Sequence, residues 1–119
     1  YECYASAKAL IDAVNKANST NLDAFQIFAK ENFDKPEVRS VIDKWIDEMI
    51  IGLINIIYIF NPPLIVLGGG IMNEDYVIDL IDRKIYNLLM DNFKNVNIVR
   101  SKLKSDSALL GVAYEAAKL

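Results

Sequence analysis

Residues 62–71 constrain the fold of this chain more than any other stretch. Two prolines, Pro62 and Pro63, are followed by the apolar run LIVL and then by three consecutive glycines. Proline ends a helix, and a short apolar run between turn-forming residues is typical of a strand. Because the run has no polar alternation, we expect a strand that is buried on both faces, as in a parallel sheet.

The three glycines after this strand, Gly68, Gly69 and Gly70, are candidate ligand-binding residues. Glycine adopts positive φ and has no Cβ, so a nucleotide or a sugar can lie directly against the backbone. The same residues would also serve a plain tight turn into a helix that packs on the sheet. Three glycines in a row do not form the G-x-G-x-x-G pattern, so the spacing leaves both interpretations open.

Composition excludes several classes of site. The 119 residues are 53% hydrophobic, which is enough for one domain with a real core. The chain has no histidine and one cysteine, Cys3, so it cannot form a Ser-His-Asp triad or an internal disulfide, and a zinc site made from this chain alone is implausible. The net charge is −3 and the 13 basic residues are scattered, which argues against nucleic acid as a partner of this segment.

Location follows from the same features. A single cysteine fits a reducing compartment, and we expect a cytoplasmic protein. The apolar run at residues 49–60 is about a dozen residues long, whereas a membrane helix needs roughly 20, so we expect no membrane partner. The chain begins at Tyr1 and shows no signal peptide, so we interpret it as a piece of a larger protein.

Apolar residues recur at helical spacing in four stretches, residues 6–15, 22–32, 36–60 and 73–89. The third has roughly 25 residues and should span about 37 Å at 1.5 Å per residue. Its end, residues 49–60, is apolar on nearly every side, so we expect it to be buried.

Polar residues predict where these helices begin. Thr20 with Asp23 three residues later resembles a capping box for the second helix. Asp34, two residues before Pro36, is expected to cap the third, because proline is tolerated in a first helical turn. Asn73 is expected to cap the fourth.

Residues 96–99 predict a second strand, and Ser105 begins a last helix that runs to the C-terminus. The strand-helix-strand segment should form a right-handed parallel crossover. Two parallel strands with open edges do not make a stable sheet. We therefore expect an α/β fold whose sheet is incomplete in this chain, with further strands supplied by other residues.

A resemblance to a known family rests on four stretches. The segment IFNPPLIVLGGGI at residues 59–71 resembles the "nIFnPelIvLGGGi" segment of the ROK family of bacterial sugar kinases and sugar-responsive repressors. ECYAS at residues 2–6 is similar to the "ExYAS" that follows the family's zinc loop, and IDKW at residues 42–45 agrees in order and spacing. DSALLGVA at residues 106–113 is similar to "DdAgLlGAa". The resemblance covers essentially the whole chain and corresponds to the C-terminal part of a longer family member.

The resemblance implies an actin-like (ribonuclease H-like) two-domain ATPase fold, with ATP and sugar bound between the domains. Gly68, Gly69 and Gly70 match the adenosine motif and are the expected nucleotide-binding residues. Glu2 matches a glutamate that accepts hydrogen bonds from sugar hydroxyls. Cys3 falls at a variable position and is not a zinc ligand, since the structural zinc site is expected just upstream of this chain.

Acidic residues refine the expected nucleotide position. Glu74 and Asp75 lie in the first turn of the helix behind the glycines, where they would repel a phosphate group. We therefore expect this loop to meet the adenosine or the α-phosphate, and not the transferring γ-phosphate.

The family also implies how the chain is divided and what it lacks. Residues 1–61 would be a helical region and residues 62–119 a strand-helix-strand-helix unit on the nucleotide side. The catalytic base and the phosphate loops would lie in an N-terminal domain, so we expect no catalytic residue and no metal ligand here, and no activity from this segment alone. Trp45 and the tyrosines are assigned to packing.

Two functions fit the resemblance. The first is an ATP-dependent hexose kinase that uses ATP and Mg²⁺, with the sugar, its own N-terminal domain and a second copy as partners. The second is the effector-binding and dimerisation domain of a sugar-responsive repressor, and only this alternative would involve nucleic acid. The sequence does not identify the sugar.

Overall fold

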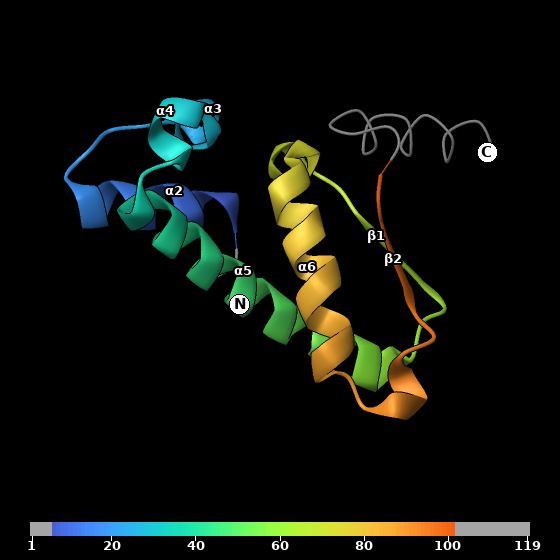
Figure 1. Ribbon diagram of the computed structural model, residues 1–119. Coiled ribbons are helices and arrows are strands. Elements are labelled where there is room, and N and C mark those ends of the chain that lie inside the picture. Colours follow the sequence, from blue (N-terminus) through green and yellow to red (C-terminus); the bar gives the residue numbers. More distant parts are fainter. Residues whose placement is uncertain (1–5, 102–119) are drawn as a thin grey trace, which may run out of the picture.

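The computed structural model describes residues 6–101 of the chain. This range contains helices, two short 3₁₀ turns and a two-stranded parallel sheet (Figure 1). In chain order the elements are α2 (Ala7–Asn18), α3 (Ala24–Phe28), α4 (Lys30–Phe33), α5 (Pro36–Phe60), β1 (Leu64–Leu67), η1 (Gly70–Asn73), α6 (Asp75–Leu88), η2 (Asp91–Phe93) and β2 (Asn97–Arg100).

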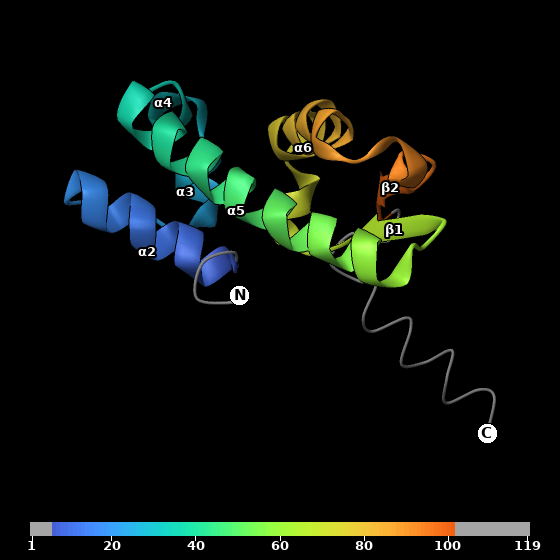
Figure 2. The same ribbon diagram turned by 90° about the horizontal axis from the view of Figure 1, so that it is seen from below.

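The long helix α5 joins two regions of the molecule. Helices α2, α3 and α4 gather around its N-terminal half, while α6 crosses it and the strands lie beside its C-terminal half (Figures 1 and 2). In the first region Leu10 and Val14 of α2 pack with Ile42 and Ile46 of α5, and all four side chains are fully buried. The Trp45 indole N–H donates to the Ser6 carbonyl (3.0 Å), which ties the start of α2 to α5.

The first two helix starts follow local side-chain chemistry. Ser6 caps α2 by accepting a hydrogen bond from the Ala9 N–H (3.1 Å). A capping box does open α3, but Asp23 is its N-cap and Gln26 its return partner. The prediction that Thr20 is the cap was wrong, because its hydroxyl is donated back to Asn15 Oδ1 (2.9 Å) in the loop after α2.

Two other predicted caps were also wrong. Asp34 ends α4 in a helical conformation, so it cannot take the extended backbone of an N-cap, and α5 begins after Lys35 without a side-chain cap. Pro36 at the first helical position already fixes a helical φ there. Asn73 belongs to the tight turn η1, which places Glu74 at the N-cap of α6.

Helix α5 has the 25 residues that the sequence predicts, and it ends at Asn61 in the left-handed region (φ 43°). Its apolar end is not buried on every side among the described residues. Ile51 and Phe60 are 55% and 73% exposed, because α6 and the sheet cover only one side of the helix.

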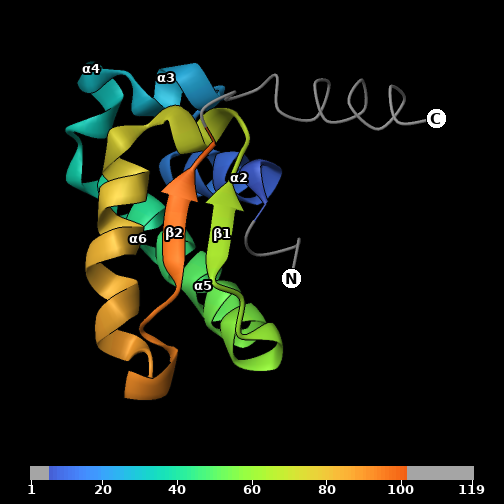
Figure 3. The same cartoon turned by 90° about the vertical axis from the view of Figure 1, so that its right-hand side faces the viewer.

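Strands β1 and β2 pair in parallel, with Ile65 opposite Ile98, which confirms the predicted crossover. Both α5 and α6 lie on one face of this sheet (Figure 3). On that face Ile65 and Ile98 pack against the core. On the other face Leu64 and Val66 are 51% and 54% exposed, so the expectation of a strand buried on both faces was wrong for the described residues. The sheet is incomplete here, as the sequence predicts.

Candidate functional site

The candidate site lies at the bend where the chain leaves β1. The Ser101 N–H donates to the Leu67 carbonyl (2.8 Å), so the two strands stay paired up to the bend. Gly69 then has φ 104° and ψ 163°, a conformation that a residue with a Cβ rarely adopts. The middle glycine of the triplet is therefore required by the backbone itself.

The backbone of this bend is open. A Cβ built on Gly69 or Gly70 would have no heavy atom of residues 6–101 within 4 Å, and one on Gly68 would lie 4.0 Å from Ser101 Cβ, an ordinary contact. No described side chain seals the outer glycines. The turn alone would need only Gly69, so the bare backbone at Gly70 leaves room for a ligand to approach.

A hollow of about 340 Å³ lies beside the bend. It is formed by the start of α2, by α3 and by η1, three segments that the fold brings together. Its lining residues are Ala7, Ala24, Phe25, Phe28, Gly70, Ile71, Asn73 and Glu74. A mostly apolar hollow of this size with a few polar groups is typical of a small-molecule site.

Phe25 is the lining residue that the sequence placed wrongly. It belongs to the stretch 22–32, whose apolar residues at helical spacing predicted packing, but Phe25 is 88% exposed. An aromatic ring held at the rim of a hollow is a surface on which a planar group can stack. Only the fold, which sets α3 against the glycine bend, reveals this role.

The charges around the bend are partly compensated. Asp75 is the first residue of α6, and its Oδ1 lies 2.8 Å from Nη1 of Arg100 at the end of β2. The same nitrogen also donates to the carbonyls of Asn73 (3.1 Å) and Met72 (3.4 Å). Glu74 lines the hollow and has no salt bridge among the described residues. No sequence pattern indicated Arg100, which comes to the bend only through the pairing of β2 with β1.

Comparison with known proteins identifies the family. The model of the ROK family matches residues 1–118. This chain belongs to the ROK family. Among curated relatives, it is 29% identical over 117 residues to an uncharacterized protein of Clostridium perfringens, with 92% of this chain and 39% of the relative covered. It is 21% identical over 97 residues to the N-acetyl-D-glucosamine kinase of Yersinia enterocolitica, with 82% and 32% covered. The chain therefore spans about a third to two fifths of the curated relatives that it matches.

Solved structures of ROK proteins share the fold. A ROK family glucokinase from Streptomyces griseus, in complex with glucose and AMPPNP, superposes with a TM-score of 0.85 at 20% identity, with 99% of this chain and 44% of the glucokinase covered. The ROK hexokinase from Thermus thermophilus gives a TM-score of 0.80 at 22% identity, with 95% and 39% covered. These likenesses confirm that the ROK chain has part of the actin-like fold.

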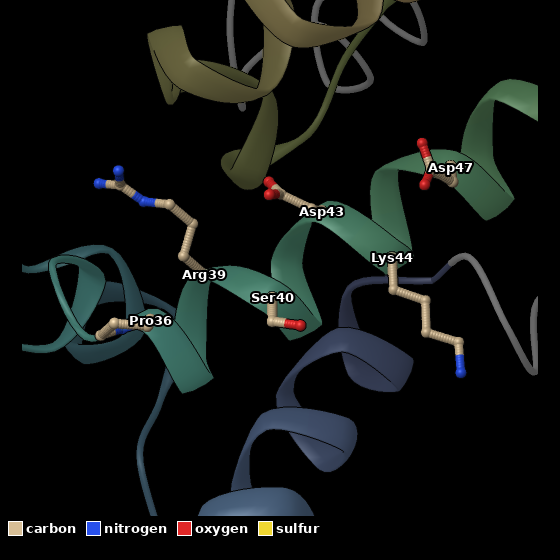
Figure 4. A pocket seen from close by; sticks show the side chains of 6 residues that line it. All are labelled: Pro36, Arg39, Ser40, Asp43, Lys44 and Asp47. Atoms are coloured by element: carbon tan, nitrogen blue, oxygen red, sulfur yellow. The ribbon is translucent and has the colours of Figure 1, made fainter.

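A second hollow, of about 440 Å³, lies on α5 of this ROK chain (Figure 4). Its two carboxylates are already paired with side chains of α6. Asp43 accepts a hydrogen bond from the Tyr76 hydroxyl, and Asp47 lies 2.7 Å from Lys84 Nζ. Arg39 stacks on the Phe33 ring, with 4.2 Å between Cζ and the ring centroid. Burial and the hydrogen bond to Asp43 raise the pKa of Tyr76 above 10.0. We interpret this hollow as the joint between α5 and α6 and assign it no ligand.

The other residues that the sequence singled out lie away from the candidate site or outside the described residues. Glu2 and Cys3 lie outside the described residues, as do residues 102–119 with the predicted last helix. Trp45 packs as predicted, and the Tyr86 hydroxyl donates to the Val96 carbonyl (2.9 Å). Between residues 6 and 101, no group of three or more acidic or cysteine side chains could hold a metal ion. None of the helices in the same range has the length and hydropathy needed to cross a membrane.

Proposed function

We propose that this chain is the C-terminal part of an ATP-dependent ROK sugar kinase, which transfers the γ-phosphate of ATP to a hydroxyl of a hexose. One observation carries the proposal: the open backbone at Gly69 and Gly70 lies beside a hollow large enough for a small planar ligand. The names of the relatives support it, since they include a glucokinase, a hexokinase and an N-acetyl-D-glucosamine kinase.

In this proposal the hollow receives the nucleotide base. The exposed ring of Phe25 stacks on the base, and Ile71 supplies an apolar wall. The ribose and the first phosphate lie along the backbone of Gly69 and Gly70, where no Cβ keeps them away. Glu74 and Asp75 would repel further phosphate charge, so the γ-phosphate lies farther from the bend.

The transfer step itself is assigned to residues outside this segment. Phosphoryl transfer depends on positioning and on the charge neutralisation that Mg²⁺ and fixed donors supply. We assign this segment to nucleotide binding, because the family resemblance implies that the catalytic base and the phosphate loops lie in an N-terminal domain. On the same ground we propose that the segment is inactive by itself.

A pair of exposed phenylalanines tests the proposal in the full-length protein. Phe25→Ala should weaken ATP binding about tenfold, because loss of a stacked ring removes roughly 1.4 kcal/mol. Phe60→Ala is the matched control, since this ring is also exposed (73%) but lies at the far end of α5. Calorimetric titration with ATP measures both variants, and hexose affinity should stay unchanged.

A glycine variant gives a second measurement. Gly70→Ala adds a Cβ where no described atom lies within 4 Å, so the melting temperature should not change. ATP affinity should fall, because the new methyl group occupies space that the nucleotide needs. Wild-type affinity in both Phe25→Ala and Gly70→Ala would overturn the proposed site, and a full-length protein that binds no nucleotide would overturn the function.

The alternative to a kinase is a sugar-responsive repressor, and an experiment must distinguish the two. No described contact favours it, so it is tested by activity: a full-length protein that binds a hexose and DNA but transfers no phosphate to any hexose would be a repressor. A coupled assay of ATP consumption across a panel of hexoses answers this and identifies the sugar.

Three further assignments are proposals that rest on family membership. We propose that Glu2 accepts hydrogen bonds from sugar hydroxyls, that a structural zinc site precedes Tyr1, and that the protein is a cytoplasmic homodimer. Glu2→Ala should weaken hexose binding and leave ATP binding unchanged, because a charged acceptor is lost only on the sugar side. Unchanged hexose affinity would contradict the first assignment.

A further inference from the structure

Arg100 holds the short segment that follows the glycine bend. Its Nη1 donates to Asp75 Oδ1 (2.8 Å), to the Asn73 carbonyl (3.1 Å) and, at longer distance, to the Met72 carbonyl (3.4 Å). The two carbonyls belong to η1, and Asp75 opens α6. One guanidinium at the end of β2 therefore contacts both elements that follow the bend.

Ile71 and Met72 anchor η1 in the core, but polar support for the segment is sparse. Neither η1 nor α6 has a side-chain cap at its N-terminus. A Cβ at Gly69 or Gly70 would meet no described heavy atom within 4 Å, so the bend is not packed on that side. Because glycine is the most mobile residue of a chain, the path of the segment depends on contacts made just after it. Among these contacts, Arg100 makes the charge-assisted hydrogen bonds.

The same segment forms one wall of the hollow. Asn73 and Glu74 line it, and the Asn73 carbonyl is one of the acceptors of Arg100. A shift of η1 would therefore move this wall relative to Phe25 on the opposite side. The positive charge of Arg100 also compensates the negative charge of Asp75 at the start of α6. Without this compensation, the charges of Asp75 and Glu74 would both repel a bound phosphate.

We propose that Arg100 is a positioning residue for the nucleotide site: it fixes η1 and α6 against the end of β2 and reduces the negative charge at the bend. The inference rests on the proposed function. It assigns Arg100 no contact with the nucleotide, because the interactions that carry it are those of Nη1 with Asp75, Asn73 and Met72. An ordinary ion pair at the surface would affect neither ligand, since such pairs contribute little to folding.

The test compares nucleotide and sugar binding in variants of the full-length protein. Arg100→Met keeps much of the side-chain length and removes every donor. We expect its Kd and KM for ATP to rise about three- to tenfold, the range for loss of one or two charge-assisted hydrogen bonds. The KM for the hexose and kcat should stay within about twofold of the wild type. Arg100→Lys should recover part of the ATP affinity, because one ammonium donor still reaches one acceptor.

Lys84→Met is the matched control. It breaks another ion pair of α6, between Lys84 Nζ and Asp47 (2.7 Å), at a position remote from the bend. Its ATP affinity should equal that of the wild type. The melting temperature of each variant is measured in parallel. If Arg100→Met lowers the melting temperature and weakens the binding of ATP and of the hexose equally, the inference is overturned.

Two outcomes separate the inference from the proposed function. Wild-type protein that binds ATP, together with unchanged ATP affinity in Arg100→Met, would overturn the role of Arg100 and leave the function intact. Wild-type protein that binds no nucleotide would overturn the proposed function and the inference with it.

Discussion

The two regions joined by α5 use their apolar residues differently. Around the N-terminal half of α5, Leu10, Val14 and Ile46 are fully buried by helices that are close in sequence. In the sheet region, Leu64 and Val66 are equally apolar but half exposed on the face away from α5 and α6. Helices can close a core among themselves, whereas a parallel sheet needs cover on both faces. The helical region is thus largely self-contained, and the sheet region depends on polypeptide outside the described residues.

The largest effect is expected from truncation within the helical region. Ile46→Ala should lower the free energy of unfolding by about 2–5 kcal/mol, because it leaves a cavity in a closed core. Ile51→Ala, five residues later on the same helix and 55% exposed, should lower it by less than about 1 kcal/mol. Urea denaturation of the full-length protein measures both. Equal losses of unfolding free energy would contradict the difference between the two regions, because they would show that α5 is covered on both sides.

The second effect concerns the bend at the end of β1. Gly69→Ala should lower the free energy of unfolding by about 1–3 kcal/mol, because alanine is strained at φ 104°. Gly70→Ala, whose backbone lacks this positive φ, is the control and should unfold like the wild type. Thermal unfolding compares the two. A normal melting temperature for Gly69→Ala would mean that the bend is not held in this conformation.

The open face of the sheet gives the third effect. Val66→Thr keeps the shape of the side chain and replaces a methyl group with a hydroxyl. If other polypeptide covers this face in the full-length protein, as we expect, the free energy of unfolding should fall by about 1–2 kcal/mol because the hydroxyl is buried. Lys94→Met, at an exposed ion pair away from the sheet face, is a control and should have little effect. A Val66→Thr protein as stable as the wild type would place this face in water.

The smallest effect lies at the joint between the two regions. Tyr76→Phe removes the hydroxyl that donates to Asp43 and should lower the free energy of unfolding by about 1 kcal/mol. Because burial and this hydrogen bond raise the pKa of Tyr76 above 10.0, the folded state holds the proton more tightly than the unfolded state. The contribution is complete below pH 10 and is lost as the pH rises through the folded pKa. Denaturation between pH 8 and 11 should show a steeper decline in the wild type than in Tyr76→Phe; identical slopes would contradict this.

Helix positions could be predicted from the sequence where apolar spacing was long and regular. The 25 residues of α5 and the parallel pairing of β1 with β2 followed from Pro36, Pro62 and the strand-helix-strand order. Predicted caps failed at Asp34 and Asn73, because a neighbouring turn had already used each residue. A sequence motif identifies a residue that is able to cap a helix. The fold determines which of two adjacent elements contains that residue.

The candidate site was predictable only in part. The glycine triplet was visible because its position after a strand is unusual, and its role in nucleotide binding stays a prediction. Phe25 and Arg100 were not found, since they come to the bend from 44 residues earlier on α3 and from the end of the next strand. Sequence periodicity reports on neighbours along one element, and these two residues meet the bend only through tertiary structure.

The position of α5 also limits where the chain can be divided or labelled without loss of packing. The uninterrupted helix α5 contributes side chains to the helical core at one end and supports the sheet at the other. Neither region therefore keeps its packing if the helix is cut. Heating should therefore melt both in a single step. Fluorescent labels belong at the exposed Asn21, between α2 and α3, because the next residues, Leu22 and Asp23, pack against the core and cap α3.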